Sequence, residues 1–358
     1  MDALNLVEFE AAAREILPPV IWDYIAGGAG DESTVAENRD AFRRLKLRPR
    51  ALVNVDVRDL RTEVLGQPIA LPVLLGPTSH QRMVHADAEL ATARAAAAMG
   101  TIAVFGTGTH YSIDEIAAAA DGPLWFQLYC VESRAVTTRL IERAEAAGYT
   151  ALVLTVDASY RTRRERDLRN RFTLPQDVEL RTLVGVGLQD HLLQPGGGGM
   201  NAFIATLTPL AMTWDDIAWL RSITRMPIVL KGIMTGEDAA LAVEYGVDAV
   251  IVSNHGGRQL DGVLASVDAL PEVVDRVAGR IDILIDGGIR RGTDVIKALA
   301  LGARAVLIGR PYLWGLAAGG EAGVRQVLDL LRDEIDCAMA QLGRPNIAAI
   351  DRGMVAGG

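Results

Sequence analysis

The chain has only two cysteines, Cys130 and Cys337, among its 358 residues, so it can build neither a disulfide framework nor a cysteine-rich metal site. No uninterrupted apolar run reaches the ~20 residues needed to cross a bilayer, and the first 17 residues lack the basic start and apolar run of a signal peptide. The formal charge of −9 argues against a nucleic-acid-binding surface. These absences favour a globular, cytoplasmic protein.

Short apolar runs alternate with longer segments of helical period, which predicts repeated βα units and a parallel sheet. Eight runs are present, and eight strands close an α/β barrel. We therefore predict a (β/α)8 TIM barrel, with a doubly wound open sheet as the competing layout. The predicted strands are Ile69–Leu75, Thr101–Phe105, Leu124–Leu128, Ala151–Val156, Ile228–Leu230, Ala249–Val252, Ile281–Ile285 and Ala305–Ile308.

We predict that residues 1–358 form a single domain. Residues 1–66 precede the first strand as a helical extension, with Pro18-Pro19 able to begin a helix. Residues 67–320 form the barrel, interrupted after the fourth strand by a long insertion, 158–213, that contains the tetraglycine 196–199. Residues 321–358 form a last helix and tail. Further helices are expected at Ala88–Met99, Ser133–Ala147, Trp214–Ser222, Glu237–Tyr245, Leu270–Ala278 and Thr293–Leu301.

The strongest local motif is Ser-Asn-His-Gly-Gly-Arg-Gln-Leu-Asp-Gly at 253–262, directly after the sixth predicted strand. That position lies at the catalytic mouth of a barrel. His255 can exchange a proton near neutral pH, and Arg258 can bind a carboxylate through two parallel hydrogen bonds. A purely structural, hydrogen-bonded histidine is the alternative. The position of the motif favours a catalytic base.

Two glycine-containing turns follow the last two predicted strands. Asp286-Gly287-Gly288-Ile289-Arg290 comes after the seventh, and Gly309-Arg310 comes after the eighth. Barrels often bind phosphate at these two loops through backbone amides and a helix N-terminus. Tight connections alone would also explain the glycines, but the arginine in each turn favours a phosphate site.

Arginines also gather after the fourth predicted strand, where Thr155-Val156-Asp157 is followed by Arg161, Arg163 and Arg164. A solvated face is the ordinary interpretation of such a run, so we assign at most one or two of these arginines to a ligand. Tyr160 and Arg161 could reach the distal end of a substrate or simply face solvent. The remaining histidines (His80, His85, His110 and His191) show no spacing typical of a metal site, and none is predicted.

Taken together, these motifs closely resemble those of the FMN-dependent 2-hydroxy-acid oxidase and dehydrogenase family, which includes glycolate oxidase, lactate oxidase, mandelate dehydrogenase and hydroxymandelate oxidase. The resemblance extends from Asp23-Tyr24 to Gly309-Arg310. Besides the 253–262 motif, it rests on Phe126-Gln127-Leu128-Tyr129, Leu230-Lys231-Gly232, Thr155-Val156-Asp157 with Arg164, and the 286–290 turn.

The resemblance implies a role for each matching residue. Asp157 would orient His255, the base, while Tyr129 would contact the reacting hydroxyl. Tyr24, Arg164 and Arg258 would bind the substrate carboxylate, and Lys231 would stabilise negative charge on the reduced flavin. Residues contacting FMN would be Pro77, Thr78, Ser79, Gly106, Gln127, Thr155, Lys231 and Ser253, with Asp286, Gly287, Gly288, Ile289, Arg290, Gly309 and Arg310 at its phosphate end.

Two departures from the family pattern affect the site. Gly106 stands where relatives often offer a hydroxyl to FMN, so only its backbone can make contact there. Gly108 stands where members acting on small substrates often carry a bulky tryptophan, which suggests a roomier pocket. We therefore expect oxidation of an aryl 2-hydroxy acid, such as mandelate or 4-hydroxymandelate, with O2 reduced to H2O2.

Three alternatives stay open at the level of sequence. A dehydrogenase would pass the electrons to another acceptor. An FMN-dependent isoprenoid diphosphate isomerase would not need the paired arginines Arg164 and Arg258. A non-catalytic barrel would bind a phosphate ligand without chemistry. The resemblance also implies a homotetramer.

Overall fold

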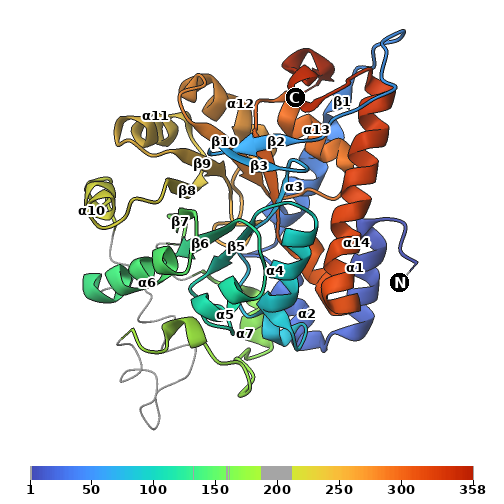
Figure 1. Ribbon diagram of the computed structural model, residues 1–358. Coiled ribbons are helices and arrows are strands. Elements are labelled where there is room, and N and C mark those ends of the chain that lie inside the picture. Colours follow the sequence, from blue (N-terminus) through green and yellow to red (C-terminus); the bar gives the residue numbers. More distant parts are fainter. Residues whose placement is uncertain (1, 132, 159, 161, 187–211, 358) are drawn as a thin grey trace.

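Eight parallel strands close into a barrel in the computed structural model, which describes residues 2–131, 133–158, 160, 162–186 and 212–357 (Figure 1). The ring closes because β11 pairs with β4 as well as with β10. This arrangement confirms the predicted TIM barrel and excludes the open sheet. The strands are β4 (Val73–Leu75), β5 (Ala103–Gly106), β6 (Leu124–Leu128), β7 (Ala151–Thr155), β8 (Ile228–Ile233), β9 (Ala249–Val252), β10 (Asp282–Asp286) and β11 (Ala305–Ile308).

Both faces of these strands are buried. Successive residues of a strand point to opposite sides, so Val73 and Leu75 belong to a cluster that includes helix residues, whereas Leu74 belongs to a second cluster. The second cluster contains no residue of a helix and fills the barrel interior, with Trp125 as its largest member. The continuous apolar runs of the sequence have this physical cause.

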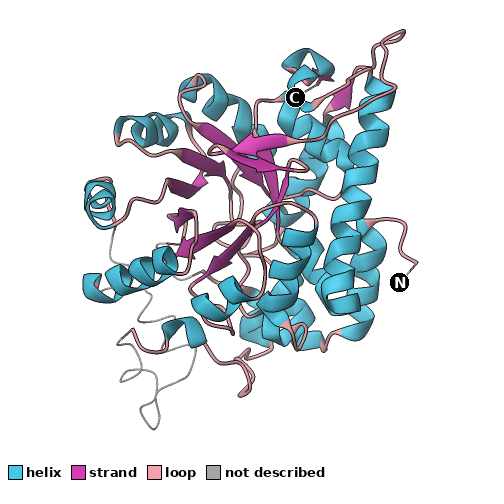
Figure 2. Cartoon of the chain, viewed as in Figure 1, coloured by secondary structure: helices cyan, strands magenta, loops and turns pink. Residues whose placement is uncertain are grey.

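Helices surround the barrel on its outer side (Figure 2). Several begin at a hydroxyl residue that caps the first turn: Ser112 accepts a hydrogen bond from the Glu115 N–H, and Ser133 accepts one from the Val136 N–H. The helices that follow strands are α4 (Ala88–Ala98), α5 (Ile113–Ala118), α6 (Arg134–Ala146), α7 (Glu165–Arg169), α10 (Asp215–Ile223), α11 (Gly236–Glu244), α12 (Ser266–Val277), α13 (Gly292–Ala300) and α14 (Arg310–Leu342).

The N-terminal extension contains α1 (Leu6–Ile16), α2 (Pro19–Ala26) and α3 (Ser33–Arg44). Pro19 occupies the first turn of α2, as predicted. Helix α1 packs along α14, so the first and the last α-helix of the described chain lie side by side (Figure 1). Nearby, β1 (Lys46–Leu47) pairs with β12 (Val355–Ala356) in a separate antiparallel ribbon.

The structure corrects one boundary. The predicted strand Ile69–Leu75 is wrong, because Ile69 ends β3 (Gln67–Ile69), which pairs with β2 (Thr62–Val64), and the barrel strand starts only at Val73. This hairpin covers the amino-terminal end of the barrel, where the Leu65 N–H donates to Asp282. The helix predicted to begin at residue 321 forms the second part of α14, after a kink where Gly319 and Gly320 leave helical geometry.

The tetraglycine 196–199 lies outside the described residues. Within the described part of the chain, no helix combines the length and the apolar character required to cross a membrane.

Candidate active site

His255 and Asp157 meet at the carboxyl-terminal mouth of the barrel. Asp157 lies two residues after β7, His255 lies three residues after β9, and the Nδ1 atom of His255 is 2.9 Å from Oδ1 of Asp157. The backbone of His255 has a φ of 59°, which a side chain other than glycine adopts only at a cost of about 1–3 kcal/mol. Its N–H donates to the Ser253 hydroxyl at 3.1 Å, which helps to hold this conformation.

A break in the regularity of β8 brings Asp157 into position. The register between β8 and β9 shifts between Lys231 and Ile233, and Gly232 has a φ of 111°. A Cβ atom at residue 232 would lie 2.6 Å from the Cβ of Asp157. Only glycine combines this conformation with so close an approach, which gives the Leu-Lys-Gly motif a structural reason.

Lys231 is the buried cation of the site, with 5% of the residue exposed. Its Nζ donates to the Ser253 hydroxyl at 2.9 Å and lies 3.3 Å from the Asp286 carboxylate. Burial alone would lower the pKa of Lys231, but Asp286 and Asp157 more than offset it and raise the pKa. The ammonium is therefore charged at neutral pH.

At neutral pH both partners at the mouth are in their basic forms. Burial lowers the pKa of His255, against the opposing effect of Asp157, so the imidazole is neutral. Burial alone would raise the pKa of Asp157, but His255 and Lys231 reverse that effect and lower it, so the carboxylate is ionised. An ionised carboxylate accepts a hydrogen bond from Nδ1–H, which leaves the lone pair of Nε2 available for a proton.

The predicted carboxylate-binding residues gather around one aromatic ring. The guanidinium carbon of Arg164 lies 5.5 Å from the centroid of the Tyr24 ring, and that of Arg258 lies 5.2 Å from it. Burial and the nearby charge of Arg164 lower the pKa of Arg258 to about 10. An anion between the two guanidinium groups would relieve this repulsion. Tyr129, half-buried, is close enough to Asp157 and Lys231 to be affected by their charges; burial raises its pKa to about 12.

The predicted phosphate end contains two buried arginines. Arg290 donates to the Ile289 carbonyl, while its buried Nε has no hydrogen-bond partner among the described residues. Burial lowers the pKa of Arg290 to about 10. Arg310 begins α14 and, through burial and the charges of Arg258 and Arg290, has its pKa lowered to about 9. The nearest acidic group that the structure describes is Glu10, 3.8 Å from the Arg290 Nε, and it makes no hydrogen bond to that nitrogen. Two such arginines side by side fit the phosphate of FMN.

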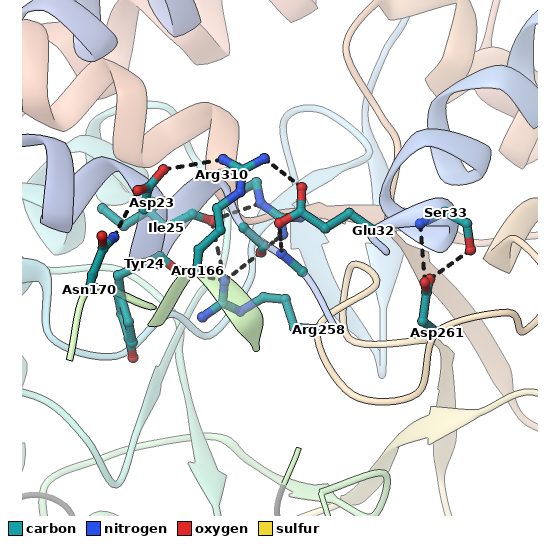
Figure 3. A network of polar contacts seen from close by, with 12 residues as sticks. Asp23, Tyr24, Ile25, Glu32, Ser33, Arg166, Asn170, Arg258, Asp261 and Arg310 are labelled. Atoms are coloured by element: carbon teal, nitrogen blue, oxygen red, sulfur yellow. Dashed lines mark hydrogen bonds and ion pairs between the residues drawn. The ribbon is translucent and has the colours of Figure 1, made fainter. Parts of the chain in front are cut away.

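Arg310 makes contacts that the sequence did not predict. Three of its nitrogens donate to backbone carbonyls, those of Ile25, Gly27 and Gly256, at 2.8–2.9 Å (Figure 3). These bonds use three of its five N–H donors. Arg310 therefore connects the predicted phosphate end to the end of α2 and to the loop that carries His255.

The other residues predicted to contact FMN lie at the strand ends around the same mouth. Gln127 donates to the Thr155 hydroxyl at 2.9 Å, and its side chain fills the space beside Gly106 where a Cβ atom would otherwise lie. Pro77, Thr78 and Ser79 follow β4, and Thr78 hydrogen-bonds to the Tyr312 hydroxyl. Gly287 and Gly288 pack against Asn38 of α3, and Gly309 precedes the first residue of α14.

His80, which no sequence motif assigned to the site, lies beside Tyr24 at the barrel mouth. His80 has a φ of 61° and is buried, with its ring centroid 6.2 Å from that of Tyr24. Its Nδ1 has no hydrogen-bond partner among the described residues. Burial and the charges of Arg164 and Arg258 lower the pKa of His80 to about 4, so it is neutral. Its position two residues after Thr78 was the signal that could have identified it.

The structure also changes the interpretation of Gly108. A Cβ atom at residue 108 would lie 2.6 Å from the Ser79 hydroxyl and 3.5 Å from Cε1 of His80. The space on this side of Gly108 is therefore filled by Ser79 and His80. Tyr160 is 84% exposed, and Arg161 lies outside the described residues.

A TIM barrel with a histidine–aspartate pair, a buried lysine and clustered arginines at its mouth fits the class of oxidoreductases that hold a phosphate-bearing flavin. The described residues contain no group of histidine, cysteine and acidic side chains suited to a metal ion. A family model for FMN-dependent dehydrogenases matches residues 13–357. The chain belongs to this family, whose members bind FMN and oxidise the CH–OH group of 2-hydroxy acids.

Named relatives cover nearly the whole chain. An L-lactate oxidase of Nostoc sp. is 51% identical over 97% of this chain and 96% of its own length, and a glycolate oxidase of Spinacia oleracea is 46% identical over 99% and 96%. Among solved structures, a soluble mutant of the membrane-associated (S)-mandelate dehydrogenase of Pseudomonas putida has a TM-score of 0.92 at 39% identity, with all of both chains covered. A mandelate oxidase bound to (S)-2-phenylpropionate has a TM-score of 0.88 at 40% identity over 99% and 98%.

Proposed function

We propose that the chain oxidises an aryl 2-hydroxy acid, such as mandelate or 4-hydroxymandelate, to the 2-oxo acid, with O2 reduced to H2O2. The observation that carries the chemistry is the pairing of neutral His255 with ionised Asp157, beside buried arginines that carry excess positive charge. A base, a carboxylate site and a buried cation at one barrel mouth are what oxidation of a hydroxy acid requires.

The side chains divide the work as follows. Arg258 and Arg164 bind the substrate carboxylate, and the Tyr24 ring between them limits its orientation. His255 accepts a proton at Nε2, and Asp157 stabilises the resulting imidazolium across 2.9 Å. Tyr129 contacts the reacting hydroxyl. FMN, when bound, supplies the acceptor for two electrons.

The residues at the flavin end each have a separate task. Lys231 holds positive charge next to the position of the flavin ring, and Ser253 fixes its ammonium group. Arg290, Arg310, Gly309 and the 286–289 turn hold the phosphate end. Pro77, Thr78, Ser79, Gly106, Gln127 and Thr155 line the remaining part of the cofactor site.

The support for an aryl substrate comes from the structural neighbours. Gly108 adds none, because Ser79 and His80 occupy the space beside it. The solved structures named above are mandelate enzymes, and one of them holds a phenyl-bearing acid. The lactate oxidase and the glycolate oxidase favour a small aliphatic acid instead. Burying a phenyl ring contributes about 1.5–3 kcal/mol, so we expect kcat/KM for mandelate to exceed that for lactate by roughly tenfold or more.

The electron acceptor forms the second part of the proposal. The two sequence relatives are both named oxidases, which supports O2. A dehydrogenase that uses another acceptor is the alternative, and the mandelate dehydrogenase neighbour favours it. The two arginines around Tyr24 count against a diphosphate isomerase, because a planar carboxylate matches their donors.

An anaerobic absorbance titration tests the chemistry. Mandelate, 4-hydroxymandelate, lactate and glycolate are added separately to the holoenzyme, and bleaching of the yellow chromophore is recorded. We expect one equivalent of an aryl acid to bleach it completely; no bleaching by any of the four would contradict the proposed reaction. Readmitting air should then yield one H2O2 per 2-oxo acid, whereas a chromophore that stays bleached in air identifies a dehydrogenase.

We also propose a cytoplasmic homotetramer, which the resemblance to the family implies. Size-exclusion chromatography with light scattering measures the assembly directly, and four times the 38.3 kDa chain is the expected mass.

A further inference from the structure

Arg166 joins two segments that are far apart in the sequence. It lies on α7, in the insertion after β7, and its guanidinium contacts Asp23 at 3.3 Å and Glu32 at 2.5 Å (Figure 3). Asp23 belongs to α2, and Glu32 immediately precedes α3. Arg166 therefore binds the insertion to both ends of the turn that connects α2 to α3.

Each of the two carboxylates is also held by a second donor. The other oxygen of Asp23 accepts a hydrogen bond from the Asn170 amide at 2.8 Å, and the other oxygen of Glu32 accepts one from the Gly28 N–H at 3.1 Å. A further backbone bond runs from the Gly30 N–H to the Arg163 carbonyl at 3.2 Å. The contact between the insertion and the α2–α3 turn is thus a connected network.

This network borders the predicted carboxylate site directly. Tyr24 is the neighbour of Asp23, and its ring stacks on Phe172 of the insertion with centroids 4.3 Å apart. Arg164 lies two residues before Arg166 and faces the same Tyr24 ring. On the barrel side, Arg258 donates to the carbonyls of Tyr24 and Gly27. The end of α2 is therefore bound on two sides. Arg258 and Arg310 contact it from the barrel, and Arg166 contacts it from the insertion.

We infer that Arg166 is a positioning residue for substrate binding: by bridging Asp23 and Glu32, it holds Tyr24 and Arg164 in the geometry that receives the substrate carboxylate. The inference rests on the proposed function for the identity of the ligand. Arg166 touches neither His255 nor Lys231 in the described structure, so it acts on binding and leaves the proton-accepting step unaffected.

The test uses holoenzyme and compares Arg166→Gln with Arg169→Gln. Arg169 is an exposed residue of the same helix, so its replacement makes the same change of charge outside the network. Two quantities are measured. One is the Kd of oxalate, a carboxylate without a carbon-bound hydrogen to remove, from the change in flavin absorbance. The other is the anaerobic rate of flavin reduction as a function of mandelate concentration.

We expect Arg166→Gln to raise the oxalate Kd and the half-saturating mandelate concentration about three- to tenfold. This is the lower part of the range for coupled residues, because the Arg166 side chain is 41% exposed. The limiting reduction rate should change less than about twofold, since the base is untouched. Arg169→Gln should match the wild type, and Arg166→Lys should restore part of the affinity.

An unchanged oxalate Kd in Arg166→Gln overturns the inference, as does a parallel loss of affinity, limiting rate and FMN content. If Arg166→Gln does not fold, Glu32→Gln tests the inference in its place. The amide oxygen that this change introduces can still accept a hydrogen bond from the Gly28 N–H, but the negative charge facing Arg166 is gone. Glu32→Gln must then weaken oxalate binding in the same way. Oxalate binding is read without turnover. A wild type that binds oxalate but oxidises no hydroxy acid therefore refutes the proposed function and leaves this inference testable.

Discussion

Replacing Asp157 by Asn isolates the electrostatic contribution of the carboxylate. Asn keeps an oxygen that can accept from Nδ1–H of His255, so the ring can remain in place. With Nδ1 and Oδ1 2.9 Å apart, the centres of the two delocalised charges lie about 4 Å apart. At an effective dielectric constant of about 20, this separation corresponds to about 4 kcal/mol of stabilisation of the imidazolium. We expect flavin reduction to slow by about a thousandfold.

The pH dependence separates this effect from structural damage. The base must be neutral to act, so the rate of reduction falls as the pH drops through the pKa of His255. Burial lowers this pKa and Asp157 raises it, so removing the carboxylate lowers the pKa further. The acidic limb of the rate profile should therefore move to lower pH in Asp157→Asn.

Anaerobic stopped-flow absorbance at saturating mandelate measures both quantities. Asp336→Asn serves as the control, because Asp336 is a carboxylate paired with Arg58 outside the site. A slowing of less than about fivefold, or an acidic limb that moves to higher pH, would refute the reasoning.

Three further predictions concern stability and cofactor binding. Burial raises the pKa of Glu89 from 4.5 to about 7, so the folded protein loses stability as the pH rises across that window. In thermal unfolding, Glu89→Gln should be more stable than the wild type by up to roughly 3 kcal/mol at pH 8 and little changed at pH 4.5. Equal gains at both pH values would contradict this. Lys231→Met leaves buried Asp286 and Asp157 without their cation and should lower the free energy of urea unfolding by about 3–5 kcal/mol. Adding Asp286→Asn should recover part of this loss. No recovery would show that Asp286 is not the unpaired charge. Gly108→Ala places a Cβ atom 2.6 Å from the hydroxyl of Ser79, a predicted FMN contact, and should reduce the FMN content measured by absorbance. Full FMN content in this variant would show that Ser79 moves freely.

Sequence reasoning succeeded where one periodicity or one motif determined the structure. The barrel could be predicted because strands buried on both faces form continuous apolar runs. The location of His255 at the barrel mouth could be predicted because its motif follows such a run, whereas its role as a base stays a prediction. The hairpin at β2 and β3 was missed, since Ile69, the last residue of β3, and Val73–Leu75 read as one apolar run although they belong to different sheets.

Contacts over long sequence distances were beyond the reach of local patterns. No sequence pattern near Arg166 predicts an ion pair with Asp23. No pattern near Arg310 predicts hydrogen bonds to the carbonyls at the end of α2. The family resemblance supplied roles for residues that match its motifs. Gly108 illustrates the limit of that approach: a small residue suggested space, but the three-dimensional arrangement fills that space with Ser79 and His80.

The bonds from Arg310 to Ile25 and Gly27 also govern when the mouth of the barrel can form during synthesis. They join positions 285 and 283 residues apart, so the end of α2 leaves the ribosome long before its partner exists. Helix α1 is likewise synthesised before α14, and the apolar face of α1 stays uncovered until α14 has formed. Because such distant contacts form late, the substrate side of the mouth is completed only after the last barrel strand has been added. A chain truncated before residue 310 would thus lack Arg310 and its bonds to Ile25 and Gly27, and the end of α2 would be held only by earlier residues such as Arg258 and Arg166.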